Sequence, residues 1–192
     1  VLFRSSLVKD GTSLSVPPRT KFRAYWDFGD YYCFYPEISV SGGKGAAIRT
    51  GWFEGFFAKD GSKMDRAAFD GGTNRPLYDF FRPDGSGRIV FTTPWWRPGR
   101  WCELEVETAD EPVVLEGVSL VETRYPLERE GFFASDDPTL DYVQRICLRG
   151  MQMCMHEMFF DCPYYEQQMY PGDTRVQLNV LSALSRDERM IK

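Results

Sequence analysis

The stretch TRYPLEREGFFASDDPTL, residues 123–140, separates two parts of the chain that have different hydrophobic patterns. Before it, short aromatic and β-branched runs alternate with polar residues, which is typical of strands. After it, apolar residues recur at steps of three and four, which is typical of a helix. We therefore place a domain boundary at Tyr125-Pro126, with one domain over residues 1–126 and a second over residues 127–192.

The first domain is predicted to be an antiparallel β-sandwich. In CELEVE, residues 102–107, the acids fall on one face and the apolar residues on the other. Turn signals such as Ser41-Gly-Gly, Lys59-Asp-Gly-Ser and Arg97-Pro-Gly separate many short runs, as in sandwiches. The predicted strands are Phe22–Trp26, Tyr31–Tyr35, Ile38–Val40, Ala46–Ile48, Ile89–Thr92, Cys102–Val106, Val113–Leu115 and Ser119–Thr123.

The second domain is predicted to begin with two helices. Asp136-Asp137-Pro138 supplies an acidic cap followed by a proline in the first turn, and Pro163 ends the pattern. A second helix is predicted to start at Asp173-Thr174, with the acid as its cap. Because these helices cannot bury their apolar faces alone, we expect further helices to follow and interpret the chain as part of a longer protein. The first apolar face is Leu140, Val143, Cys147, Met151, Cys154 and Met158.

Composition excludes several classes of function. The chain has 192 residues, a net charge of −5 and a pI near 5.0, which disfavours nucleic acid as a partner. No apolar run approaches the roughly 20 residues that span a bilayer. Five irregularly spaced cysteines and one histidine do not form a zinc pattern, so we expect no metal and no cofactor. Compartment and oligomeric state stay open.

Three local features have two interpretations each. The glycine cluster Ser41–Ala46 lacks the spacing of a phosphate-binding loop and predicts a hairpin turn. His156 is expected in the middle of the first helix, packed or solvated rather than catalytic. The aromatic segment Pro94–Trp101 could be a platform for sugar rings, or a turn in which arginines lie on indole planes.

The loop DCPYYEQQMYPGD, residues 161–173, is the candidate active site. Glycosidic bonds break when one carboxylic acid protonates the leaving oxygen and a second carboxylate handles water or the anomeric carbon. Glu166 has aromatic neighbours and two flanking acids, Asp161 and Asp173, and apolar surroundings and negative charge both favour a protonated carboxyl group. The alternative is structural: the aspartates cap helix ends and Glu166 is solvated.

This loop resembles the signature loop of bacterial α-L-rhamnosidases, glycoside hydrolase family 78. Asp161-Cys-Pro, an acid-bearing loop and Gly172-Asp173 carry the resemblance, together with Tyr125-Pro126 and Asp136-Asp-Pro-Thr-Leu. It implies a β-sandwich followed by an (α/α)6 barrel, here truncated after its first helices. Tyr164-Tyr165 stands where many members have an arginine and a further acid, which leaves the substrate preference open.

The resemblance also implies roles for the loop residues. Glu166 would be the general acid, Asp161 and Asp173 would bind rhamnose, and Tyr170 would stack on the sugar, with Tyr165 as a further substrate-binding candidate. The family inverts configuration, and its general base would lie outside this chain, so we expect the chain alone to be inactive. The alternatives are another six-hairpin glycosidase and a non-catalytic carbohydrate-binding β-sandwich.

Overall fold

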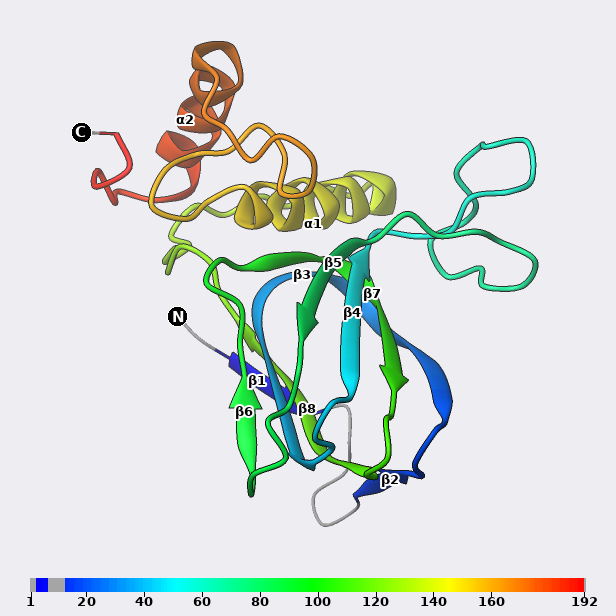
Figure 1. The fold of residues 1–192 in the computed structure, drawn as a ribbon. Coiled ribbons are helices and arrows are strands. Elements are labelled where there is room, and N and C mark those ends of the chain that lie inside the picture. The colour runs from blue at the N-terminus through cyan, green and yellow to red at the C-terminus, as the bar shows by residue number, and fades with distance from the viewer. Residues whose placement is uncertain (1–2, 7–12, 192) are drawn as a thin grey trace. The chain divides into compact units, whose positions relative to one another are not determined.

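A computed structural model describes residues 3–6 and 13–191 of the chain. Contacts within the chain divide it into two compact units, Leu2–Glu122 and Thr123–Lys192. We call them the sheet unit and the helical unit and describe each by itself. Figure 1 shows the strands of the first unit and the two helices of the second.

The sheet unit is an antiparallel β domain, as the sequence predicts. Its described strands follow the order β1-β8-β3-β7-β4-β5, with β2 also paired to β8 and β6 to β3 (Figure 1). Three strands were not expected from the sequence pattern, namely β1, the short strand β2 and the edge strand β5. The strands are β1 (Phe3–Ser6), β2 (Leu14–Val16), β3 (Lys21–Gly42), β4 (Ala47–Phe53), β5 (Leu77–Phe81), β6 (Ile89–Phe91), β7 (Arg97–Glu107) and β8 (Val113–Glu122).

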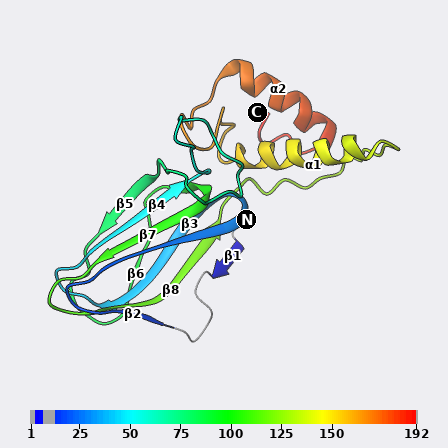
Figure 2. The ribbon, with the colours of Figure 1, turned by 90° about the vertical axis from the view of Figure 1, so that its right-hand side faces the viewer.

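The long strand β3 joins the two halves of the sheet (Figure 2). Its first half pairs with β7 and its second half with β8 and β6, and the register with β7 shifts between Asp27 and Tyr32. Gly29 allows this change because its φ is +78°, and its backbone N–H donates to the Asp27 carboxylate at 2.8 Å. Three strands predicted separately are therefore one strand, and both halves of the domain belong to one hydrogen-bonded sheet.

The interior of the sheet unit is closely packed. Side chains from both halves of the sheet meet in it, including Ile38, Ile48, Leu104 and Leu115, each no more than 1% exposed. Beside this cluster, Trp52 is 0% exposed and packs edge-on against Phe34. Burial of this kind is the main stabilising term in folding.

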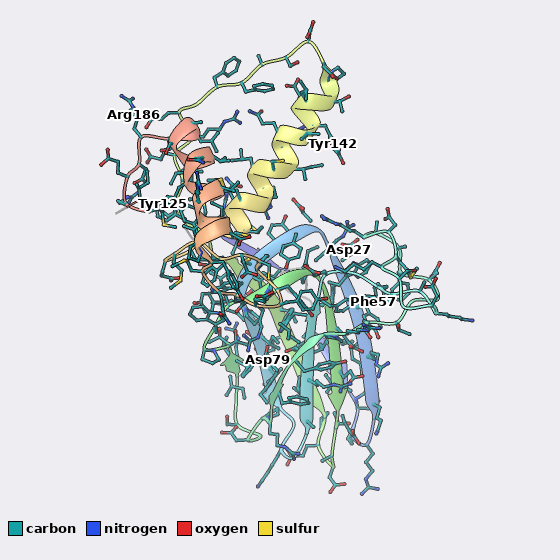
Figure 3. All side chains as sticks on the ribbon, turned by 90° about the horizontal axis from the view of Figure 1, so that it is seen from above. Asp27, Phe57, Asp79, Tyr125, Tyr142 and Arg186 are labelled. Carbon is teal, nitrogen blue, oxygen red and sulfur yellow. The ribbon has the colours of Figure 1, made fainter. Side chains whose placement is uncertain are left out.

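The aromatic segment Pro94–Trp101 differs from the predicted turn. Its arginine-containing part is the start of β7, where a turn was predicted. Arg97 binds the Asp79 carboxylate through two nitrogens at 2.8 and 2.6 Å, and the Trp52 indole donates to the same group at 2.9 Å (Asp79 is labelled in Figure 3). The planar guanidinium suits such two-point binding, so it pairs with a carboxylate here.

The first helix of the helical unit is shorter than predicted. α1 covers Pro138–Met153, and Asp137 caps it as expected by accepting the Thr139 N–H at 2.8 Å. The chain then leaves the helix and folds into a tight turn closed by an antiparallel bridge between Met155 and Phe159. The prediction that the helix continues to Met158 was wrong, because Met155 and Phe159 are buried by folding back and not by extending the helix.

His156 lies in this turn and not in the middle of a helix. The side chain is 6% exposed, and Nε2 lies 3.2 Å from the carbonyl oxygen of Met153. Burial lowers the pKa of His156, because a charged imidazolium loses its hydration inside the protein. The part of the sequence prediction that described a packed histidine is therefore correct, whereas its helical position is not.

The second helix begins earlier than predicted. α2 covers Pro171–Leu184, with Tyr170 at its N-cap and Pro171 in its first turn, where a missing N–H costs nothing. Asp173 lies within the first turn and is not the cap. Its negative charge still suits the positive end of the helix dipole.

The two helices bury only part of their apolar surface. Met151 and Met155 pack with Phe159 and Leu181 in a small core. In contrast, Leu140, Val143 and Ile146 on α1 are about half exposed, and so is Tyr142, which Figure 3 labels. Across the described residues, neither helix is long and apolar enough to cross a membrane.

Candidate active site

The loop between α1 and α2 is closed by hydrogen bonds at its base. The backbone N–H of Asp161 donates to the carbonyl of Gln168 at 2.8 Å, and the Asp161 carboxylate accepts the Gln168 N–H at 3.0 Å. Gln167 has a left-handed backbone, with φ of +52°, and its side chain donates to the Pro163 carbonyl at 2.8 Å. These bonds hold residues 161–168 as a compact loop.

Glu166 lies at the tip of this loop and is exposed. Its backbone N–H donates to the sulfur of Cys162 at 3.3 Å. The Tyr170 hydroxyl donates a short hydrogen bond to Oε2 of Glu166. Tyr170 is fixed in turn as the N-cap of α2, where its carbonyl accepts the Thr174 N–H at 2.9 Å. The start of α2 therefore positions the Glu166 carboxylate.

The charges of all three loop acids act on the phenol of Tyr170. The hydrogen bond to Glu166, the Glu166 charge and the charges of Asp161 and Asp173 all raise the pKa of Tyr170. Asp161 and Asp173 also contribute, after burial and Cys162, to a pKa of about 11 for Cys154. The loop thus brings together three carboxylates that are spread over 13 residues of sequence.

Asp161 is held as an anion. Partial burial acts to raise its pKa, but hydrogen bonds from the backbone N–H groups of Gln168 and Cys162 outweigh this effect, so the pKa of Asp161 is below its ordinary value. An ionised carboxylate fixed in this way accepts hydrogen bonds from hydroxyl groups. Gln168, which the sequence pattern did not single out, therefore positions Asp161.

The aromatic neighbours of Glu166 are arranged differently from the expectation. Phe159 and Phe160 are 3% and 4% exposed and belong to the interior of the unit. Tyr165 is 67% exposed, with its ring against Tyr164 at 4.9 Å between centroids. Because Glu166 is exposed to solvent, the shielding that the sequence suggested is not supplied by the described residues.

Two polar atoms on α2 lack a partner among the described residues. They are Oγ1 of Thr174 and Oε1 of Gln177, and both atoms are buried. The other end of the Gln177 amide donates to the Phe160 carbonyl at 2.9 Å, which ties α2 to the start of the loop. Buried polar atoms normally find a partner, so these two can accept a hydrogen bond from a further group near the loop.

The described part of the chain contains no group of three or more histidine, cysteine, aspartate or glutamate side chains arranged to hold a metal ion. The loop itself offers carboxylates and phenols. Carboxylates can donate or accept protons and can hold hydroxyl groups, and the rings can pack on an apolar ligand face.

Comparison with known proteins points to one family. Residues 128–192 match the family described as the bacterial alpha-L-rhamnosidase 6 hairpin glycosidase domain. The family match begins in the segment before α1 and includes the whole acidic loop. No curated protein sequence matches the chain at a significant level.

Three solved structures share the fold over most of the chain. A GH78 family rhamnosidase of Bacillus sp. GL1 matches 93% of this chain with a TM-score of 0.71 and 22% identity. A rhamnosidase from Klebsiella oxytoca with rhamnose bound matches 92% with a TM-score of 0.72 and 14% identity. An alpha-L-rhamnosidase from Dictyoglomus thermophilum matches 93% with a TM-score of 0.63 and 16% identity.

The chain spans 18%, 35% and 20% of the lengths of these three proteins. The likeness in structure covers both the sheet unit and the helical unit, whereas the family match covers the helical unit. The resemblance to bacterial α-L-rhamnosidases is therefore confirmed, by the six-hairpin glycosidase family over residues 128–192 and by the fold of family 78 enzymes over most of the chain.

Proposed function

We propose that this chain is part of an inverting α-L-rhamnosidase and supplies its general acid, Glu166. The observation that carries the proposal is the hydrogen bond from the Tyr170 hydroxyl to the Glu166 carboxylate, in a loop whose base holds the Asp161 carboxylate in place. In the proposed enzyme the helices α1 and α2 begin an (α/α)6 barrel, of which the chain holds only the first part.

The loop residues have different roles in glycoside cleavage. Glu166 donates its proton to the glycosidic oxygen as the bond to the anomeric carbon breaks, so that the aglycone leaves as a neutral alcohol. Asp161 and Asp173 accept hydrogen bonds from the sugar hydroxyls, and Tyr170 and Tyr165 pack on the ring. A base on the opposite side of the sugar removes a proton from the attacking water.

An inverting mechanism defines how far the general base lies from the general acid. The two carboxyl groups of an inverting enzyme lie roughly 6.5–9.5 Å apart, which leaves room for the water. We assign no residue of this chain as the base and place it in the remaining part of the barrel. The purified 192-residue chain should therefore not hydrolyse rhamnosides, and measurable turnover by it would contradict the assignment.

The general-acid role is tested in the longer protein that contains this chain. Glu166→Gln should lower the hydrolysis rate of an alkyl α-L-rhamnoside by about two to four orders of magnitude. The loss should be smaller for p-nitrophenyl α-L-rhamnoside, because p-nitrophenolate leaves without needing a proton. Glu188→Gln, at another exposed acid of the same unit, is the matched control and should leave both rates unchanged.

The outcomes separate the alternatives. Equal losses on both substrates would assign Glu166 to binding and not to proton donation, and unchanged rates would remove it from the mechanism. If the unsubstituted protein cleaves another glycoside and not rhamnosides, the enzyme is a different six-hairpin glycosidase. Sugar binding without any hydrolysis would indicate a non-catalytic carbohydrate-binding module.

A further inference from the structure

The outer face of β3, β7, β4 and β5 in the sheet unit carries a row of charged and aromatic side chains. The strand register places Arg23, Glu105, Arg49 and Phe80 side by side in one row across these four strands. Successive residues of a strand point to opposite faces. Their neighbours Phe22, Val106 and Ile48 accordingly pack in the interior.

This face is hollowed. A cavity of about 560 Å³ lies over the row and is lined by Lys21, Arg23, Arg49, Glu105, Glu107 and Phe80, with the small side chain of Ala47 at its floor. Sites for small molecules usually measure roughly 300–1,000 Å³. The hollow is therefore large enough for one or two sugar rings.

The polar groups of the hollow are held in place before any ligand binds. Glu105 accepts ion pairs from both Arg23 and Arg49, and only 20% of its side chain is exposed. The Arg49 guanidinium lies over the Tyr78 ring, 4.2 Å from its centroid. A guanidinium fixed by a carboxylate and a ring loses little freedom when its remaining N–H groups bind a ligand.

The buried carboxylate of Glu103 fixes Tyr78, the ring that lies against Arg49. Glu103 is 2% exposed and accepts hydrogen bonds from Tyr25 at 2.9 Å, Asn74 at 2.9 Å and Tyr78 at 3.1 Å. Burial, followed by the charge of Glu103 and its hydrogen bond, raises the pKa of Tyr78 to about 12. Tyr78 therefore stays neutral and fixed beneath Arg49.

Phe80 supplies the apolar part of the hollow. Its ring is 68% exposed, although it neighbours charged side chains on a regular strand. Charges in and under the hollow balance, since Lys21, Arg23 and Arg49 oppose three carboxylates. Such a surface does not select a phosphate or an acidic chain.

We propose that this hollow is a binding site for neutral carbohydrate. The C–H face of a pyranose ring packs on Phe80, while its hydroxyls accept from the guanidinium groups and donate to Glu105 and Glu107. The ligand is a pyranose unit of a glycan chain, because the hollow is open to solvent at the exposed side chain of Lys21. This proposal does not rest on the glycosidase proposal, since the hollow contains none of the loop residues.

The test is native electrophoresis of the 192-residue chain through gels that contain a soluble neutral polysaccharide. Galactomannan, xyloglucan and arabinoxylan are the three polymers, and methyl α-L-rhamnoside is the soluble competitor. At least one polymer should retard the chain. Phe80→Ala should raise the dissociation constant about tenfold, because one ring–sugar contact is worth roughly one order of magnitude.

Three further variants test whether the hollow itself binds the polymer. Ala47→Trp fills the hollow while leaving the Phe80 side chain in the sequence, and it should abolish retardation. Trp95→Ala removes another exposed aromatic ring of the sheet unit, which is 42% exposed and does not line the hollow. Glu166→Gln alters the acidic loop. Neither variant should change retardation.

Four results would overturn the proposal. These are no retardation by any of the three polymers, retardation that Phe80→Ala and Ala47→Trp both leave unchanged, retardation lost only in Trp95→Ala, and retardation lost only in Glu166→Gln. Polygalacturonate serves as an acidic fourth polymer. Retardation by it and by none of the three neutral polymers is a form of the first result and would show that the hollow selects an acidic glycan. If the longer protein hydrolyses rhamnosides but no polymer retards the 192-residue chain, the proposed function stands and the proposed binding site does not.

Discussion

The sheet unit and the helical unit both have amphipathic sequences, but they bury their apolar residues to different extents. In the sheet unit, Phe34 and Trp52 are 0% exposed and lie between strands of both halves of the sheet. In the helical unit, burial is concentrated where α1 ends, around Met155 and Leu181, and the first half of α1 stays open. The comparison shows that the apolar face of a strand or helix is buried only where another element packs against it.

The largest expected effect is in the closed interior of the sheet unit. Trp52→Ala should lower the free energy of unfolding by about 3–5 kcal/mol, because it opens a cavity in a packed core and leaves the Asp79 carboxylate without one donor. Chemical denaturation followed by the fluorescence of the remaining tryptophans measures this loss. All five tryptophans lie in the sheet unit, so the signal reports on that unit.

Trp95→Ala is the control for this measurement, because the ring is already 42% exposed. Its effect should stay below about 1 kcal/mol, as for most surface substitutions. Equal losses in the two variants would show that the Trp52 side chain is not in a closed core.

The second prediction compares the two faces of α2. Leu181→Ala should cost about 2–5 kcal/mol, because Leu181 is 0% exposed between the two helices. Val176→Ala, at a residue 63% exposed on the same helix, should cost no more than about 0.5 kcal/mol. Circular dichroism at the helical band measures both. A costly Val176→Ala would mean that this face of α2 is covered.

The third prediction concerns the buried carboxylate of the sheet unit. Glu103→Gln should cost about 1–3 kcal/mol, because an amide nitrogen would then face hydrogen-bond donors in place of an acceptor oxygen. Glu107→Gln, whose side chain is 60% exposed in the same strand, should change the unfolding free energy very little. Thermal unfolding followed by tryptophan fluorescence distinguishes the two, and a neutral Glu103→Gln would disprove the network.

The smallest effect is the pH dependence of the helical unit. Burial lowers the pKa of His156 in the folded state, so the unfolded state binds its proton more readily. Neutral His156 therefore contributes fully to the free energy of unfolding above the unfolded pKa of about 6.5. This contribution is lost as the pH falls from there through the lower pKa of the folded state. The loss should be on the order of 1 kcal/mol or less.

His156→Gln is the matched variant, because its side-chain amide can still donate to the Met153 carbonyl. Helical circular dichroism during thermal unfolding at pH 7 and pH 5 should show a smaller difference for the variant than for the parent chain. His156 is the single histidine of the sequence, so no other side chain has an ordinary pKa in this window. An unchanged pH dependence would exclude His156 as its source.

The sequence correctly predicted the features that depend on residues close together in the chain. Asp137 caps α1 as expected, because its carboxylate needs only a backbone N–H two residues away. The antiparallel class followed from the alternation in β7, where Cys102, Leu104 and Val106 are all buried. The candidate acids were also found from the sequence, since their residue types and the family resemblance both pointed to one loop.

Tertiary contacts that spacing rules do not capture explain where the structure differs from the sequence-based predictions. The helix α1 stops at Met153 because the bridge between Met155 and Phe159 buries both side chains, which no spacing rule could reveal. The acids of CELEVE share one face of the strand, as predicted, but the pattern did not reveal that Glu103 is buried by partners 25 to 78 residues away in sequence.

The sequence by itself determined the antiparallel class, the capped start of α1 and the set of loop acids, because each depends on residue type and short spacing. Only the tertiary structure decided that Tyr170 holds Glu166, that Gln168 holds Asp161 and that Phe80 lies open beside two paired arginines. These arrangements depend on strand register and on the path of a loop. Both are fixed by the total free energy of packing and hydrogen bonding, to which residues far apart in the chain contribute together.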